Sequence, residues 1–412
     1  MATVNNNTPT LRFPEFKGNW KKKKFNEIFI FSTGKSIKQN EASPEFETPC
    51  VRYGELYHMY DEVITEVINK TNLNKSELTF SQGNEILLPS AGEDPMDIGS
   101  ASALTIKNVA IGRTINVLRP LITNVYSQIY VAYHINHKLK KDISKLAKGV
   151  SISNVYNSDL KTLEITLPTL QEQTKISTFL TTVDEKLQAL KQKKSILEQY
   201  KKGVMQKIFS QELRFKDDNG NTFADWEEKM LGDVCKTTKS GGTPISTKRE
   251  YYNGDIPFLS ISDMTSQGKY LNYTSNHISK LGLDNSASWV VPAHSIIYSM
   301  YASIGFVAIN NIPLATSQAV LNLILKEGIN TDFIYYTLVD FQKKITQFVT
   351  TGTQGNLNAQ SVRGFKIQIP SLKEQTKIAT FLSTIDEKIN QCQAQITNTE
   401  VWKRGLLQGM FI

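Results

Sequence analysis

The stretches EQTKISTFLTTVDEK at 172–186 and EQTKIATFLSTIDEK at 374–388 are identical at 12 of 15 positions. They stand 202 residues apart, and the three exceptions exchange Ser for Ala, Thr for Ser and Val for Ile. At the same offset, 167–210 aligns with 369–412 with 19 identities in 44 positions. An internal repeat of this length sets the architecture of a chain. The sequence is therefore a tandem duplication.

Shorter similarities flank each copy of the repeated segment. LRF occurs at 11–13 and again at 213–215, and a tryptophan, Trp20 or Trp226, precedes the strand-like run that follows. The duplication predicts two globular domains, each followed by one long helix. We place these four parts at 1–166, 167–211, 212–368 and 369–412.

Both copies begin with a helix-start signal. Thr169 and Glu172 in the first copy, and Ser371 and Glu374 in the second, have the spacing of a capping box. In that motif the hydroxyl and the carboxylate accept hydrogen bonds from backbone amides at the start of the helix. We therefore expect both glutamates to bond to the backbone there.

Beyond these caps, apolar residues recur in alternating steps of four and three, the heptad pattern of a coiled coil. Eight of ten seam positions are apolar in each copy, and at 1.5 Å per residue each helix would be about 55–60 Å long. The seam contains Ile176, Leu180, Val183, Leu187, Leu190, Lys194, Leu197, Lys201, Val204 and Ile208 in the first copy, and Ile378, Leu382, Ile385, Ile389, Cys392, Ile396, Thr399, Lys403, Leu406 and Met410 in the second.

An apolar seam of this length needs a partner, and the two copies match each other in period and length. Two similar halves in one chain imitate a symmetric dimer, which favours antiparallel pairing about a pseudo-two-fold axis. The alternative is that each helix packs against its own globular domain. That arrangement leaves the period near 3.5 and the great length of the helices unexplained.

The two globular domains contain short apolar runs between turns rich in Gly, Asn and Pro, which predicts a mixed α/β fold. Strand-like runs occur at 84–89, 102–111 and 127–135 in the first domain, and at 255–261, 288–292, 295–301, 305–309 and 319–325 in the second. The clearest helical pattern is TDFIYYTLVDFQKKITQFV at 331–349.

Five polar loops in these domains combine hydroxyls, amides and basic side chains, at 32–40, 50–57, 147–154, 237–252 and 350–358. Such groups can contact phosphates and base edges of DNA. The same residues populate ordinary turns, so the prediction concerns the loops as a set. The candidate DNA-binding residues are Lys35, Ser36, Lys38, Arg52, Tyr53, Lys148, Ser151, Asn154, Lys239, Thr243, Ser246, Thr247, Lys248, Arg249, Thr353, Gln354 and Asn356.

Composition narrows the functional classes. The net charge of +8 is concentrated as +3 in 1–170 and +4 in 171–210, while 211–370 is neutral. This excess permits nucleic-acid binding without requiring it. Three scattered cysteines argue against a disulfide framework, and the absence of a long apolar run or a secretory signal leads us to expect a cytoplasmic protein.

No catalytic constellation is present in the sequence. GKS at 34–36 lacks the glycine that a phosphate-binding loop needs, because Phe29 occupies its place. His134 and His137 have no accompanying Cys or acidic cluster, so we expect no metal site. The D/N-P-P-Y/F tetrapeptide of amino-methyltransferases is also missing. We expect this chain not to be an enzyme.

The order of globular domain, P-[ST]-L-x-E-Q-T-K-I helix, second globular domain and second helix resembles the specificity subunit of type I restriction-modification enzymes. The similarity covers the whole chain, through LPTLQEQTKI, IPSLKEQTKI and GGTPISTKREYYNGDIPFLSISDM. It implies that each domain reads one half of a bipartite double-stranded DNA target. The paired helices would set the spacing and dock two modification subunits.

The resemblance also implies that the chemistry resides elsewhere in the complex. S-adenosylmethionine would be bound by the modification subunits, ATP and Mg by restriction/translocase subunits, and no cofactor by this chain. Because partners can supply phosphate neutralisation, we expect weak, salt-sensitive DNA binding by the chain alone. Two other hypotheses remain: a coiled-coil adaptor that assembles proteins without reading DNA, and an enzyme with an unrecognised active site.

Overall fold

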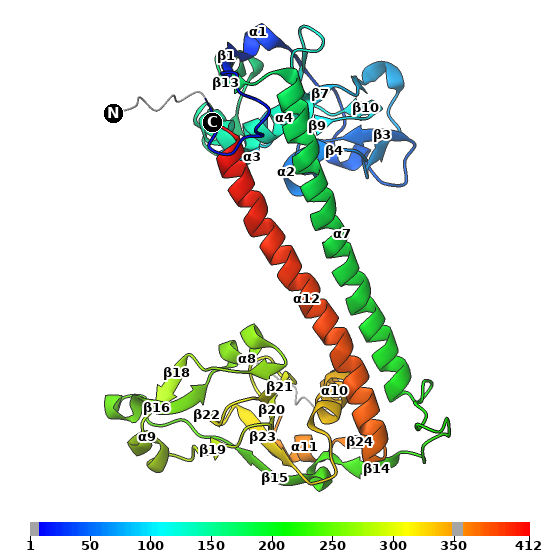
Figure 1. The fold of residues 1–412 in the computed structure, drawn as a ribbon, viewed down its shortest axis with the longest axis vertical. Coiled ribbons are helices and arrows are strands. Elements are labelled where there is room, and N and C mark those ends of the chain that lie inside the picture. Colours follow the sequence, from blue (N-terminus) through cyan, green and yellow to red (C-terminus); the bar gives the residue numbers. More distant parts are fainter. Residues whose placement is uncertain (1–7, 348–356) are drawn as a thin grey trace. The chain divides into compact units, whose positions relative to one another are not determined.

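The computed structural model describes residues 8–347 and 357–412. Within them the chain divides into two compact units, 8–191 with 394–412 and 192–347 with 357–393 (Figure 1). Helices α7 (Leu170–Phe209) and α12 (Leu372–Met410) are the products of the repeated segment, and each contributes to both units. At 40 and 39 residues, they measure about 60 Å each at 1.5 Å per residue.

The first unit is built on two sheets of mixed strand direction. The five-stranded sheet has the order β2 (Phe29–Thr33), β11 (Ile115–Pro120), β7 (Glu85–Pro89), β9 (Ser102–Leu104), β4 (Val63–Ile64). The four-stranded sheet has the order β5 (Lys70–Thr71), β3 (Thr48–Val51), β10 (Lys107–Ile111), β6 (Phe80–Gln82). Two ribbons pair β1 (Lys21–Lys24) with β13 (Glu164–Leu167), and β8 (Ala91–Gly92) with β12 (Ser153–Asn154). The short helices are α1 (Phe25–Ile28), α2 (Glu55–His58), α3 (Pro95–Ile98), α4 (Gln128–His134), α5 (Lys140–Lys145) and α6 (Asn157–Leu160).

The second unit repeats both sheets with the same strand directions. Its five-stranded sheet has the order β15 (Cys235–Ser240), β23 (Val320–Leu325), β20 (Ile296–Ser299), β21 (Val307–Asn310), β17 (Tyr270–Leu271). Its four-stranded sheet has the order β18 (Asn276–Ile278), β16 (Tyr252–Leu259), β22 (Leu314–Thr316), β19 (Val290–Val291), and β14 (Glu227–Met230) pairs with β24 (Lys366–Ile369). The helices are α8 (Ile261–Gln267), α9 (Lys280–Asp284), α10 (Thr331–Phe341) and α11 (Ala359–Arg363). The mixed α/β prediction is confirmed, and the duplication extends through both globular domains.

One predicted strand is wrong. The run 127–135 is rich in β-branched and aromatic residues, yet it forms α4 rather than a strand. Ser127 caps this helix by accepting the amide of Tyr130 at 3.4 Å. Tyr130 and Tyr133 are fully buried, and tertiary packing of this kind overrides local propensity. The equivalent helix in the second unit is α10, whose sequence carries a clear helical period.

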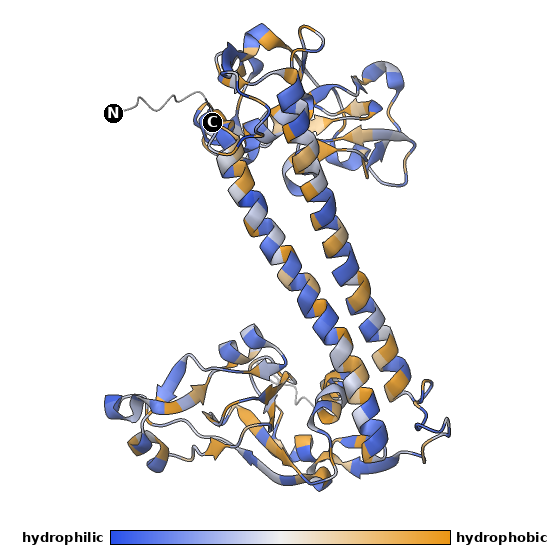
Figure 2. Ribbon diagram, in the orientation of Figure 1, coloured by the Kyte–Doolittle hydropathy of each residue, from blue (hydrophilic) through white to orange (hydrophobic). Residues whose placement is uncertain are grey.

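The predicted seam positions differ in burial from the residues between them. All twenty seam positions are buried or half-buried, while the residues between them along the middle of α7 are exposed. Burial is complete toward the helix ends that pack on the sheets, as at Leu180 and Leu382, both 0% exposed. In the middle, Leu187, Leu190 and Leu197 are half-buried. Figure 2 shows apolar residues recurring along both helices among polar ones.

Ion pairs establish the direction in which the helices pair. In the first unit, Asp184 of α7 meets Lys403 of α12 at 2.6 Å, and Lys191 meets Glu400 at 2.9 Å. From the first ion pair to the second, the residue number rises along α7 and falls along α12, so the two helices pair antiparallel. In the second unit Lys201 meets Asp386 at 2.5 Å. Asp386 is 202 residues after Asp184, and Lys201 is 202 residues before Lys403, so the two ion pairs are equivalent with the helices exchanged. A pseudo-two-fold repeat is expected to have this relation.

The alternative arrangement, in which each helix packs against its own globular domain, also holds in part. In each unit, parts of both long helices pack in one globular core. Ile176, Leu180 and Val183 of α7 belong to the core of the first unit, together with Leu406 and Met410 of α12. The second unit contains Ile378, Leu382 and Ile385 of α12, with Met205 and Ile208 of α7. Each helix thus packs first on the domain that precedes it and later on the other domain.

The expected role of the two glutamates is corrected by the structure. The hydroxyl of Thr169 accepts the amide of Glu172 at 3.3 Å, as a capping box requires. The Glu172 carboxylate, however, turns away from the helix start. It accepts two hydrogen bonds from Arg12, at 2.7 and 2.8 Å, and one from the indole of Trp20 at 3.3 Å. A charged bidentate partner is a stronger ligand for a buried carboxylate than a neutral amide.

The second copy repeats this arrangement with Glu374. Its carboxylate binds Arg214 at 2.8 and 3.0 Å and the indole of Trp226 at 3.1 Å. Both glutamates are at most 1% exposed. The repeated LRF and Trp residues noted in the sequence therefore supply the hydrogen-bond donors to these two glutamates, and the resulting ion pair anchors each long helix.

Replacing Glu172 by Gln should reduce the free energy of unfolding by about 2 kcal/mol, because the half-buried Arg12 would lose its charged hydrogen-bond partner. Urea unfolding followed by tryptophan fluorescence measures the loss, and Glu374→Gln should give a similar one. Glu185→Gln, at an exposed position of α7, is the control and should change stability by less than about 0.5 kcal/mol. Equal stabilities of E172Q and E185Q would contradict the anchor.

Candidate nucleic-acid interface

Three polar loops of the first unit converge on the turn between β10 and β11, which we call the central turn (112–114). The first loop leaves β2 at Gly34, where an added Cβ would lie 2.0 Å from the carbonyl oxygen of Gly112. Only glycine allows this close approach. Beyond it, Ser36 and Ile37 adopt φ of 49° and 55°, and the carbonyl of Ser36 accepts the amide of Arg113 at 3.0 Å.

Backbone hydrogen bonds attach the other two loops to the same turn. The amide of Gly112 donates to Val51 at 2.8 Å, which places the second loop (50–57) against the turn. The amide of Ser90 donates to Thr114 at 2.9 Å, and Val155, just after the third loop (147–154), donates to Ser90 at 3.0 Å. The first and second loops therefore bond directly to the central turn, and the third loop is connected to it through Ser90.

The second unit repeats the close approach of a glycine and two of these bonds around the turn between β22 and β23 (317–319). An added Cβ on Gly241 would lie 1.8 Å from the carbonyl oxygen of Thr316, as at Gly34 in the first unit. Met300 donates its amide to Ala319 at 2.8 Å, and Leu357 donates to Met300 at 3.0 Å. These two bonds correspond to those of Ser90 and Val155.

The loop after β15 displays most of the predicted residues of the second domain. Ser246, Thr247, Lys248 and Arg249 are all exposed. The loop is held in place on both sides of this stretch, since Tyr252 donates its hydroxyl to the carbonyl of Pro244 at 2.7 Å and Tyr251 is buried. It therefore offers hydroxyls and positive charge on a fixed backbone.

Two more predicted residues of this domain lie at the start of that loop and on the strand before it. Lys239 lies over the ring of Trp289, 5.5 Å from its centroid. Thr243 donates its hydroxyl to Gln318 of the turn at 2.8 Å. The remaining predictions, Thr353, Gln354 and Asn356, lie outside the described residues.

In the first domain the predicted residues differ in how free their side chains are. Lys35, Lys38 and Ser151 are exposed, and Ser36 is half-buried. Tyr53 is 39% exposed.

Two of the predicted basic side chains in this domain are bound within the protein. Arg52 pairs with the buried Glu55 at 2.7 Å, and Lys148 pairs with Asp159 at 2.8 Å. Asn154 donates its side-chain amide to Ile152 at 3.3 Å within the third loop. Arg52 and Lys148 therefore hold their loops in place as well as carrying charge.

Sequence reasoning missed the two residues at the centres of these loop clusters. Arg113 is exposed in the central turn of the first unit, and Gln318 is exposed at the equivalent place in the second. Each stands alone among small or apolar neighbours in the sequence, so no local pattern marks it. The signal available was the position of both between two strand-like runs that the duplication makes equivalent.

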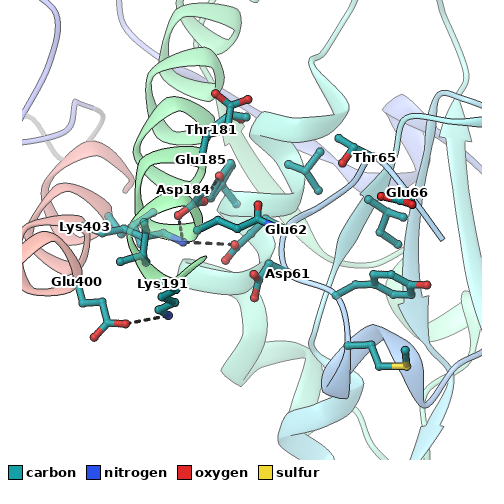
Figure 3. Close-up of a pocket in the computed structure, with 18 of the residues that line it drawn as sticks. Asp61, Glu62, Thr65, Glu66, Thr181, Asp184, Glu185, Lys191, Glu400 and Lys403 are labelled. Atoms are coloured by element: carbon teal, nitrogen blue, oxygen red, sulfur yellow. Dashed lines mark hydrogen bonds and ion pairs between the residues drawn. The ribbon is translucent and has the colours of Figure 1, made fainter. Parts of the chain in front are cut away.

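A second candidate site is a cavity of about 700 Å³ in the first unit, lined by α7, α12 and the segment around β4 (Figure 3). Its most buried acidic group is Glu62, which faces His137 at 3.1 Å and Lys403 at 3.6 Å. Burial by itself would raise the pKa of Glu62. The hydrogen bond from His137 and the charge of Lys403 outweigh burial and lower that pKa to about 2.

Lys403 is the centre of this cluster. Burial would lower its pKa, but the carboxylates of Glu62 and Asp184 raise it above the ordinary value. The hydroxyl of Tyr133 also donates to Asp184. The ionised groups near Lys403 thus satisfy one another, and the cluster fastens α12 to α7 and to the sheet rather than presenting reactive groups.

Over the described ranges, no group of three or more His, Cys, Asp or Glu side chains is placed to hold a metal ion. Cys50, Cys235 and Cys392 are free and buried. No helix in the described part of the chain has the length and apolar character needed to cross a membrane. The loop clusters around the two turns are therefore the surfaces best suited to bind a large polar ligand.

Comparison with known proteins identifies relatives over most of the chain. The family model described as "Type I restriction modification DNA specificity domain" matches residues 17–199 and again 224–399. The MjaIX specificity subunit of Methanocaldococcus jannaschii is 30% identical over 50% of this chain and 48% of its own length, so the match spans about half of that relative. The putative MjaX specificity subunit of the same organism is 28% identical over 72% of this chain and 70% of its own length.

Solved structures show the same fold. The S subunit of a type I restriction-modification system from M. genitalium superimposes with a TM-score of 0.64 at 20% identity, covering 98% of this chain and 99% of the other. A chain from a study of complex assembly and conformational transition in a type I R-M system superimposes with a TM-score of 0.54 at 15% identity, covering 95% and 96%.

Lowering the pH should remove the contribution of Glu62 to stability. Its folded-state pKa of about 2 lies below the ordinary 4.5, so the contribution, about 3 kcal/mol, is present above pH 4.5 and is lost as pH falls toward 2. Urea unfolding from pH 6 to pH 3 should therefore show the wild type and Glu62→Gln converging as pH falls. The exposed Glu66→Gln is the control, and a wild-type–E62Q difference that stays constant with pH would refute the assignment.

Proposed function

Because the chain belongs to the family of type I restriction-modification DNA specificity proteins, we propose that it selects a bipartite DNA target for a modification and restriction complex. Each globular domain, 1–166 and 212–368, reads one half of the target with the loops around its turn. The family model matches once in each half of the chain. The observation that carries the proposal is the arrangement of polar loops around one turn in each unit. The two units share a strand order, but their loops present different side chains.

The different loop chemistry supports two different half-sites. At equivalent places the first domain presents Arg113 and the second Gln318. Arginine and glutamine form hydrogen bonds with different base edges in the major groove. A scaffold built twice with unlike reading groups suits a target whose halves differ in sequence.

The paired helices set the separation of the two readers under this proposal. A bipartite target read on related faces of the duplex has half-sites about one helical turn, roughly 34 Å, or a multiple apart. An antiparallel helix pair is stiff enough to keep such a distance, because its backbone hydrogen bonds and its seam resist bending together.

The helices also dock two modification subunits, and two glycines support this. Gly203 in α7 and Gly405 in α12 stand 202 residues apart, and an added Cβ would meet nothing within 4 Å at either. Glycine inside a helix costs about 0.5–1 kcal/mol relative to alanine. The packing of the chain itself gives no reason for that cost, whereas close approach of a partner would.

Exposed aromatic residues accompany both glycines one helical turn earlier. Tyr200 is 51% exposed and Trp402 is 48% exposed. Exposed aromatics beside a close-approach position are typical centres of protein interfaces. Two equivalent sites on one chain fit two copies of one partner.

Cofactor chemistry belongs to those partners in this proposal. S-adenosylmethionine is bound by the modification subunits, and ATP with Mg by the restriction/translocase subunits, in the cytoplasm. This chain supplies recognition and assembly. A second candidate function is a coiled-coil adaptor without DNA readout, and equal affinity of the assembled complex for random and target DNA would favour it.

Exchanging residues 1–166 for the corresponding domain of a relative should change one half of the methylated sequence and leave the other half unchanged. The reason is that each turn and its loops are built within one globular domain. Methylome sequencing of cells that carry the chimera with its modification subunits reads both halves at once. Exchange of 212–368 is the matched control and should change the other half. Simultaneous change of both halves would contradict independent reading.

Gly203→Leu and Gly405→Leu should each remove one modification subunit from the purified complex, because leucine fills the space a partner needs. Native mass spectrometry should show two modification subunits on the wild type, one on each variant and none on the double variant. Ser195→Leu, at another exposed position of α7, should keep both. Full assembly of the double variant would show that these glycines do not face the modification subunits.

A further inference from the structure

Arg113 differs from Arg52 and Arg119, the other arginines near β10 and β11, because its side chain forms no ion pair with a buried carboxylate. Arg52 pairs with Glu55 at 2.7 Å, and Arg119 pairs with Glu85 at 3.0 Å, both carboxylates being buried. Among the ion pairs found within the described residues, Arg113 takes part in none, and its side chain is exposed. A guanidinium in this position keeps its donors available for a ligand.

The backbone around Arg113 is fixed in an unusual conformation. Thr114 has φ of 67°, and Ser36 and Ile37, on the loop whose carbonyl holds the amide of Arg113, have φ of 49° and 55°. Thr114 and Ile37 are β-branched, and such residues rarely adopt the left-handed region. Strain of this kind persists where the surrounding structure enforces it, and it gathers at sites that position a functional group. The turn therefore presents Arg113 from a rigid support.

Gln318 occupies the same place in the second unit. It lies between β22 and β23, as Arg113 lies between β10 and β11, and Met300 bonds to the following residue as Ser90 does in the first unit. The hydroxyl of Thr243 donates to Oε1 of Gln318 at 2.8 Å. An amide oxygen has two acceptor sites. Gln318 therefore keeps one acceptor site and both amide hydrogens for a ligand while its orientation is fixed.

We propose that Arg113 and Gln318 are the paired base-reading residues of the two domains, Arg113 reading a guanine in one half-site and Gln318 an adenine in the other. The inference rests on the proposed function, since it assumes that the loop clusters face DNA. Arginine donates two hydrogen bonds to O6 and N7 of guanine. Glutamine accepts from N6 and donates to N7 of adenine.

The competing role for an exposed arginine is a phosphate contact, and it differs in a measurable way. A phosphate contact strengthens binding to every sequence and is largely retained by lysine, whereas a base contact decides which base is accepted. One bidentate contact discriminates against the wrong base by about 1–3 kcal/mol, or roughly five- to 150-fold. Relaxed specificity at one position is therefore the expected signature of a base reader.

The experiment expresses the complete complex with Arg113→Gln, Arg113→Lys or Gln318→Arg and sequences the methylome of the host. R113Q should relax or change one guanine position of the first half-site by about tenfold or more, with every other position unchanged. Q318R should do the same at one adenine position of the second half-site. Lys186→Gln, which removes one positive charge at an exposed position of α7, is the control and should leave the target unaltered. Thermal unfolding of each purified variant establishes that it is folded.

Two outcomes would overturn the inference. The first is that R113Q methylates the unchanged sequence more slowly while R113K matches the wild type, which would make Arg113 a phosphate contact. The second is that both substitutions leave target and rate unaltered, which would place the turns away from the DNA. If exchange of 1–166 changes one half-site in the same cells, the proposed function stands in either case. If that exchange changes neither half-site, the proposed function itself fails.

Discussion

The structure depends on two carboxylates buried at the starts of the long helices. A buried charge is tolerated only when it is paired and hydrogen-bonded, and Glu172 meets that demand through Arg12, 160 residues earlier in the chain. The next residue continues the connection, since Gln173 donates to Pro168 and accepts the amide of Ser127, the cap of α4. These bonds fix the start of α7 to Arg12, near the beginning of the domain's sequence, and to Ser127, much later in the same domain. The same constraint recurs at Glu374 and Gln375, which explains why these side chains are identical in both copies of the repeat.

A shared scaffold leaves the exposed loop residues of the two units free to differ. The two units share strand order, strand directions and the close passage of a glycine over the turn. Their exposed residues at the turn differ completely in chemistry, a guanidinium at Arg113 and an amide at Gln318. Backbone hydrogen bonds connect the loops to each turn, in addition to side-chain contacts such as those of Arg52 and Thr243. Side chains that make no such bonds can therefore change without loss of the loop positions, which suits the selection of DNA sequences that we propose.

The sequence predicted what local periodicity and duplication can encode. The heptad spacing marks the twenty seam positions from the sequence alone, because the burial of such positions depends on which face of a helix a residue occupies. The helix at 127–135 could not be predicted in this way, since its β-branched and aromatic residues reflect burial on nearly all sides. The partners of Glu172 and the position of Arg113 among the loops depend on contacts between residues far apart in the chain. For these the duplication was the one available signal, because it matched Arg12 with Arg214 and Trp20 with Trp226.

Neither globular domain completes its core from its own half of the chain. Phe411, at the end of α12, packs on Tyr130 with ring centroids 5.2 Å apart, and Leu406 and Met410 belong to the same core. The first unit therefore needs residues more than 200 positions beyond its last strand. Contacts at such separation are costly to form during folding, because a long loop must close before they contribute. The second unit depends in the same way on Met205 and Ile208 of α7. Since each core includes residues from both long helices, the pairing of the helices and the completion of both cores are one requirement of folding.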